Sequence, residues 1–224
     1  MFKKVSLTVF ALFVICMASA LVSASSFVPV LDQSQENSNA AIWVSSTRTL
    51  CQTFTAGMTG NLTMVSILLT GVPAGELYPA TISIVELTSG IPDGTKILWS
   101  NSYETLGWSE ETDGWYDMDM SISAPFLTSG VSYGIKFCTD DDDLPADGHD
   151  DYWRLQRATN PYSDGNLWQN KNDGSGWVTA TINGTADINA DAAFRTYITV
   201  PEPVSITMFL SGLTILVRRR KIFS

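Results

Sequence analysis

Hydrophobic and polar side chains alternate with a period of two along several stretches of the chain. A period of two is typical of a β-strand that buries one of its faces. Residues 115–122 show it most clearly, and the apolar set on one side is Tyr116, Met118, Met120 and Ile122. Residues 131–138 repeat it, with an apolar set of Val131, Tyr133, Ile135 and Phe137. Both stretches are therefore predicted to be half-buried strands.

Shorter apolar runs separated by turn residues extend this pattern. Residues 25–47 are polar and are expected to form a loose arm with a short strand at 42–44. A turn is predicted at Ser89–Gly94, where Gly, Pro and Asp cluster. Between the two ends of the chain no stretch keeps a helical period, so we expect an all-β domain, a β-sandwich or jelly roll. The further predicted strands are residues 50–56, 62–69, 78–88, 96–103, 152–157 and 192–199.

Both ends of the chain have a different pattern. Lys3 and Lys4 precede an apolar run at 5–17 and then small residues, which predicts a helical signal peptide over 1–24 with cleavage after Ala24. Near the other end, residues 204–217 form an apolar run. A helix of this run is roughly 20 Å long, short of the ~30 Å hydrocarbon core, so we expect a short transmembrane helix that anchors poorly.

The last residues combine three features in a fixed order: a Pro-Glu-Pro element, the apolar run and a basic cluster. This tail resembles the PEP-CTERM sorting signal of exported bacterial proteins. The resemblance implies an exosortase partner that cuts near Pro-Glu-Pro, passage through the inner membrane, and a final location in the cell envelope, on the surface or outside the cell. An ordinary membrane anchor is the alternative. The expected domains are 1–24, 25–199 and 200–224, and the signal residues are Pro201, Glu202, Pro203, Arg218, Arg219, Arg220 and Lys221.

The region between the two signals is strongly acidic. Residues 25–199 hold 7 basic and 22 acidic residues, a net charge of about −15. Nucleic acid is an unsuitable partner, because binding it requires cations that neutralise phosphates. Such a surface suits solubility and divalent cations instead.

Four short motifs in this region resemble the choice-of-anchor modules of exported bacterial proteins, a family that implies no known catalytic activity. The third motif also resembles the tyrosine corner of Greek-key sandwiches, in which a Tyr hydroxyl bonds back to the preceding turn; Ser129 stands where that pattern usually has Pro. The motifs are Gln52–Gly57, Ile91–Gly94, Leu127–Tyr133 and Phe194–Tyr197.

Catalytic chemistry has little support in the sequence, and we expect no enzyme. His149 is the one histidine and lies in a polar loop, and no Gly-x-Ser-x-Gly is present. A carboxylate pair for glycan hydrolysis remains an alternative, since Asp117 and Asp119 face outward together and Glu86 lies on another strand.

Seven tryptophans suggest a further alternative, a carbohydrate-binding module. Trp99 and Trp153 are expected in the core. Exposed rings stack on sugars, and loop tryptophans also cap core edges. The candidates for stacking, which lie in or beside polar loops, are Trp108, Trp168 and Trp177.

Two cysteines remain after removal of the signal. Cys51 and Cys138 are both predicted to face outward, so they would form a disulfide if their strands are neighbours.

The loop at 140–151 holds seven carboxylates within twelve residues. Carboxylates and loop carbonyls suit a hard cation, which predicts a Ca²⁺ site; a solvated acidic loop is the alternative. The predicted ligands are Asp140, Asp141, Asp142, Asp143, Asp147, Asp150 and Asp151.

Taken together, these patterns favour an exported structural or adhesive protein of the cell envelope that accompanies exopolysaccharide. A carbohydrate-binding module is the second reading and a glycan hydrolase the third.

Overall fold

A computed structural model describes residues 28–70, 79–103, 114–139, 151–156, 162–171, 174–182, 185–186 and 190–200. The chain divides into two compact units, Pro29–Thr199 and a second unit from the two chain ends, of which only Val28 and Val200 are described. The described residues contain strands and turns but no helix. No candidate membrane-spanning helix is therefore found in these ranges. The predicted signal helix and transmembrane helix lie outside them.

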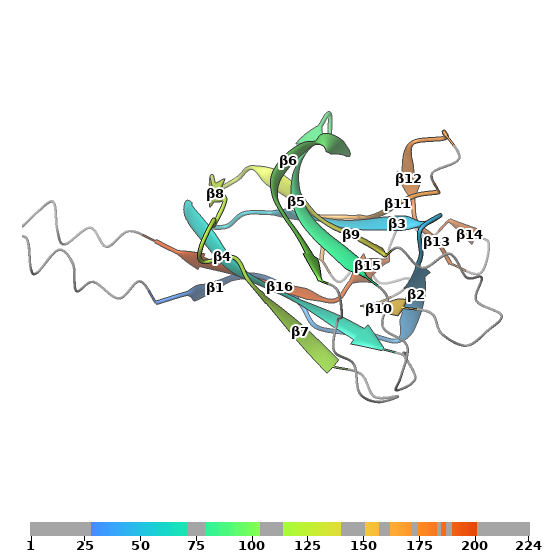
Figure 1. Cartoon of the computed structure of the whole chain (residues 1–224), viewed down its shortest axis with the longest axis horizontal. Coiled ribbons are helices and arrows are strands. Elements are labelled where there is room, and N and C mark those ends of the chain that lie inside the picture. Colours follow the sequence, from blue (N-terminus) through green and yellow to red (C-terminus); the bar gives the residue numbers. More distant parts are fainter. Residues whose placement is uncertain are drawn as a thin grey trace, which may run out of the picture. The chain divides into compact units, whose positions relative to one another are not determined.

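Two antiparallel sheets make up the first unit (Figure 1). The eight-stranded sheet has the order β1-β16-β4-β10-β15, with β7 and β8 also paired to β4, and β2 paired to β10. Its strands are β1 (Val30–Gln35), β2 (Ala40–Val44), β4 (Gly60–Thr70), β7 (Gly114–Asp119), β8 (Phe126–Leu127), β10 (Asp151–Gln156), β15 (Asp191–Ala192) and β16 (Phe194–Thr199).

The six-stranded sheet has the order β12-β11-β3-β9-β5-β6, so β12 and β6 are its two edges. A separate pair, β13 (Thr181–Ile182) and β14 (Thr185–Ala186), completes the strands. The strands of the six-stranded sheet are β3 (Thr49–Thr55), β5 (Ala80–Thr88), β6 (Ile91–Tyr103), β9 (Ser132–Thr139), β11 (Leu167–Asn170) and β12 (Trp177–Thr179).

One hydrophobic core receives side chains from both sheets. Phe54 of β3 contacts Phe194 of β16 with ring centroids 6.0 Å apart, and Phe137 of β9 contacts Trp153 of β10 at the same distance. Trp153 is fully buried and Trp99 is 8% exposed, which confirms the prediction that both belong to the core. Burial of such rings is a large stabilising term, because apolar area contributes roughly 25 cal/mol per Å² removed from water.

A buried polar network also joins the two sheets. Gln52 of β3 donates from Nε2 to Asp191 Oδ1 of β15 at 3.0 Å, and its Oε1 accepts the amide of Ala192 at 2.7 Å. The amide of Tyr162 donates to Asp191 Oδ2 at 3.3 Å. Gln52 and Asp191 are both fully buried, so these bonds replace the water that each side chain loses.

Two predictions about strands and turns need correction. The expected loose arm contains a full strand, β1, which pairs with β16 even though Val30 and Leu31 are exposed. The predicted turn at Ser89–Gly94 is only Ser89–Gly90, both with positive φ (54° and 79°), and β6 already begins at Ile91. A proline at the second position of β6 is tolerated because β6 is an edge strand.

The strand ends also differ from the alternation pattern. β7 stops at Asp119, and the chain turns before Ile122, which is fully exposed instead of buried. Similarly, β9 starts at Ser132, which leaves Val131 44% exposed. Five other residues that the alternation assigned to the inward side are confirmed as buried: Met118, Met120, Tyr133, Ile135 and Phe137.

Candidate binding face

The six-stranded sheet has a second face, opposite the shared core, which we call the outer face. In β3, Leu50 and Phe54 pack in the core, so Cys51 between them lies on the outer face. In β9, Ile135 and Phe137 pack in the core, and Lys136 therefore points outward. Strand register thus assigns each residue of this sheet to one face or the other.

Two neighbouring rows of side chains cross the outer face. The first row follows directly paired residues through five strands: Trp168, Cys51, Lys136, Ser83 and Ser100. The second row starts at the β12 edge, where Trp177 pairs with Asn170 and Asn170 pairs with Thr49. Toward the β6 edge it consists of Cys138, which pairs with Thr81, and Ser102, which also pairs with Thr81. Trp168 and Trp177, two of the three tryptophans proposed for stacking, thus lie on one face at diagonal positions.

The two edges of this sheet bend toward each other above the outer face. Figure 1 shows the β5–β6 hairpin and β12 rising on the same side of the sheet. A Cβ placed on Gly94 of β6 would lie 4.0 Å from Nε1 of Trp177 on β12. The outer face is therefore concave, with Trp177 beside the hairpin.

One part of the outer face, the covered half, is buried beneath its own side chains. Cys51 and Val85 are fully buried and Pro92 is buried, although all three lie opposite the main core. Gly134 forms the floor: a Cβ there would lie 2.5 Å from Cys51 Sγ and 3.0 Å from Val85 Cγ2. Burial raises the pKa of the Cys51 thiol, against the opposing charge of Lys136, and keeps the thiol neutral. The indole Nε1 of Trp168 is also buried, without a hydrogen-bond partner among the described residues.

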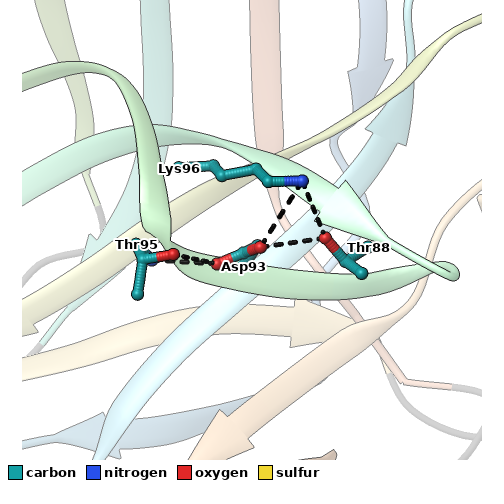
Figure 2. Close-up of polar contacts among 4 residues, drawn as sticks. All are labelled: Thr88, Asp93, Thr95 and Lys96. Carbon is teal, nitrogen blue, oxygen red and sulfur yellow. Dashed lines mark hydrogen bonds and ion pairs between the residues drawn. The ribbon is translucent and has the colours of Figure 1, made fainter.

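The tip of the β5–β6 hairpin is held by a polar cluster around Asp93 (Figure 2). Asp93 accepts hydrogen bonds from Thr95 Oγ1 at 2.7 Å, Thr88 Oγ1 at 2.9 Å and the Thr95 amide at 3.1 Å. These bonds, with Thr95 Oγ1 first, lower the pKa of Asp93 to about 2. Lys96 Nζ lies 3.7 Å from Asp93 and donates to Thr88 at 3.1 Å. The charge of Lys96 is therefore engaged within the hairpin.

The other part of the outer face, the open half, carries hydroxyls, one amine and an aromatic ring. Ser83 and Ser100 share a hydrogen bond at 2.9 Å, and Thr81 and Ser102 share one at 2.8 Å. Lys136, Trp177 and Thr179 are half-buried. Among the described residues that register assigns to the outer face, Lys136 carries the only charge, and none is a carboxylate.

The predicted disulfide is not formed: neither Cys51 nor Cys138 takes part in one. The assumption behind it was correct, since β3 and β9 are neighbours and both cysteines lie on the outer face. However, Cys51 pairs directly with Lys136 and Cys138 with Thr81. Diagonal cross-strand positions are about 7–8 Å apart, whereas the Cβ atoms of a disulfide are about 3.5–4.5 Å apart.

The other predicted site residues are placed in part. Asp117 and Asp119 face outward on β7, as predicted. They belong to the eight-stranded sheet and Glu86 to the six-stranded one, so Glu86 does not share a site with them. The described ranges contain no group of three or more His, Cys, Asp or Glu that suits a metal. Of the predicted Ca²⁺ ligands only Asp151, the first residue of β10, falls within them. His149, Trp108 and the sorting-signal residues also lie outside, and these predictions stand as made.

Sequence reasoning missed the concave shape of the outer face and the buried Gln52–Asp191 network. Two signals were present in the sequence: the apolar residues Val85 and Leu87 two positions apart in one strand, and Gly134 within an otherwise regular strand. The chain matches no known protein-family model, and no curated protein matches its sequence.

Proposed function

We propose that this protein is an exported, non-enzymatic component of the cell envelope or extracellular matrix that an exosortase sorts and that accompanies exopolysaccharide. The observation that carries the proposal is the order of elements at the C-terminus: Pro201-Glu202-Pro203, then fourteen mostly apolar residues, then Arg218–Lys221. A signal peptide at the other end would deliver residues 25–199 to the same destination. The apolar run is short for a permanent anchor, which favours removal of the tail.

The fold is proposed to be a β-sandwich of the jelly-roll type. Two antiparallel sheets contribute to one core, and ring contacts such as Phe54–Phe194 join them. Of the carboxylates considered for glycan hydrolysis, Asp117 and Asp119 share β7 of the eight-stranded sheet, and Glu86 lies on the six-stranded sheet and does not join them.

The tail is tested by the mass of the surface-exposed protein. Wild-type protein released from the envelope is expected to lack Arg218–Lys221, and replacement of Pro201, Glu202 and Pro203 by alanine is expected to hold the full-length chain in the inner membrane. Pro29→Ala, at an exposed proline far from the tail in sequence, is the matched control and should be processed normally. Mature surface protein that still carries the basic cluster would refute sorting by cleavage.

Glycan binding is the second candidate function, and one observation favours it. Trp168 and Trp177 lie on the same concave face, and hydroxyl pairs and an amine lie on other strands of that face. An aromatic ring stacks on the apolar face of a sugar, while neighbouring polar groups bond its hydroxyls. A glycan array on the purified protein tests this candidate, and loss of any signal in Trp177→Ala would assign the binding to this face.

A further inference from the structure

We propose that the open half of the outer face binds an acidic polysaccharide, in which Lys136 pairs with a uronate carboxylate and Trp177 stacks on another sugar of the same chain. This inference rests on glycan binding, the second candidate function, and names its ligand class.

The charge of the outer face differs from that of the rest of the unit. Residues 25–199 carry a net charge of about −15, yet the register places only Lys136, and no described carboxylate, on this face. The carboxylate at the hairpin, Asp93, is already bonded to Thr88, Thr95 and Lys96. Asp164 lies beside Thr55, at one end of β3. The row that contains Trp177 crosses β3 at its other end, at Thr49, so Asp164 is not next to that row. The described residues of this face therefore present no carboxylate that would repel an anionic ligand.

Lys136 is available for such a ligand. The ion pairs within the described ranges are Lys96–Asp93 and Arg195–Glu36, and Lys136 takes part in neither. Its neighbours in the row are the apolar Cys51 on one side and the Ser83–Ser100 hydroxyl pair on the other. An amine between an apolar side chain and two hydroxyls is a setting in which a charge-assisted bond to a carboxylate is strong.

The spacing of the groups requires an oligomer. Lys136 lies on β9 and Trp177 on β12, three strands apart in the order of the sheet. Strands are spaced about 4.8 Å apart, which puts these two residues roughly 14 Å from each other along the rows. This path along the surface is longer than one sugar ring, so a ligand that follows the face from Lys136 to Trp177 is an oligomer. Ser100, which is exposed and bonded to the buried Ser83, and the Thr81–Ser102 pair extend the same surface beyond Lys136.

The test compares acidic and neutral oligosaccharides on the full chain in mild detergent. Hexa-galacturonate and cellohexaose are titrated while tryptophan fluorescence is recorded, for the wild type, Lys136→Gln, Trp177→Ala and Lys96→Gln. Lys136→Gln keeps a polar, slightly shorter side chain and removes its charge. Lys96→Gln is the matched control, because that amine belongs to the hairpin cluster.

We expect the wild type to prefer the galacturonate. Lys136→Gln should weaken galacturonate binding roughly tenfold or more and leave cellohexaose unchanged, as loss of a charge-assisted hydrogen bond requires. Trp177→Ala should weaken both ligands, and Lys96→Gln neither. Equal binding of the two ligands with no effect of Lys136→Gln would overturn the acidic ligand but leave glycan binding in place. Absence of binding to either, and to every glycan of an array, would overturn both, while the mass of the processed tail still decides the sorting proposal.

Discussion

The backbone amide of Thr128 donates a 3.0 Å hydrogen bond to the hydroxyl of Tyr133, five residues further along the chain. Gly130, with φ of 79°, makes the turn between them, and the ring of Tyr133 packs 6.1 Å from that of Phe54 in the core. This is the bond that the motif at 127–133 predicted, and Ser129 in place of the usual proline does not prevent it. The bond fixes the corner between β8 and β9.

Removal of that hydroxyl should therefore destabilise the fold. Tyr133→Phe keeps the ring and leaves the Thr128 amide without its acceptor, so we expect the free energy of unfolding to fall by about 1 kcal/mol. Urea unfolding followed by tryptophan fluorescence measures it. Tyr103→Phe is the matched control, since the hydroxyl of Tyr103 forms no hydrogen bond with the described residues; an equal loss in both variants would show that the corner bond contributes nothing.

Gly134 is expected to tolerate no side chain. In a regular strand alanine is usually more stable than glycine, but at this position its Cβ would lie 2.5 Å from Cys51 Sγ. We expect Gly134→Ala to reduce the free energy of unfolding by about 1–3 kcal/mol through overpacking. Adding Cys51→Ala should recover part of the loss, because the two sites share one contact. Gly94→Ala, whose nearest atom would be 4.0 Å away, serves as the control; a strictly additive double variant would contradict the packing of the covered half.

The two thiols should differ in reactivity. Cys51 is fully buried and its pKa is raised by burial, whereas Cys138 is only half-buried. Since the thiolate is the reactive form, iodoacetamide at pH 8 should label Cys138 in the folded mature protein and Cys51 only after unfolding. Peptide mass spectrometry locates the label. Cys138→Ser should leave the folded protein unlabelled, and a wild-type protein that takes label only after reduction would show that the disulfide forms after all.

Asp93 should titrate well below an ordinary aspartate. Its pKa in the folded protein is about 2 because Thr95 and Thr88 donate to the ionised carboxylate. A lowered folded-state pKa stabilises the hairpin above the unfolded pKa of about 3.9, and this contribution is lost as the pH falls through about 2. Carboxyl-carbon NMR measures the midpoint. Thr95→Val should raise the titration midpoint of Asp93. The midpoint of Asp119, whose pKa is lowered by Ser121, should not change. An unchanged Asp93 midpoint would contradict the cluster in Figure 2.

The sequence predicted the inward and outward positions of a strand better than its ends. Met118 and Ile135 were assigned correctly because a period of two depends only on nearest neighbours along the chain. Ile122 was assigned wrongly because the turn that ends β7 depends on Asp119, whose carboxylate accepts the amide of Ser121 at 2.8 Å. β1 was missed because Val30 and Leu31 stay exposed, and its pairing with β16 is a contact between residues far apart in sequence.

The binding face was predictable residue by residue but not as a surface. The sequence singled out Trp168 and Trp177, yet their common face follows from the register of β11 with β12 and with β3. The sequence did not single out Lys136, because a single charged residue in a strand indicates no particular site. Its position between Cys51 and Ser83 depends on pairing across three strands, and Cys51 and Lys136 are 85 residues apart in the sequence, which composition and periodicity do not report.

β16 has a mechanical consequence. It is the last strand before the tail, and it is bonded on one side to β1 and on the other to β4, both antiparallel. A pull applied to the chain beyond Thr199 runs along the axis of this strand and loads the hydrogen bonds of both ladders at once, in shear. Bonds loaded together must break together, whereas a strand peeled from an edge releases them one by one. If the tail holds the protein at the membrane before processing and the outer face binds a matrix polymer, as proposed, drag on that polymer would reach the fold through a strand paired on both sides.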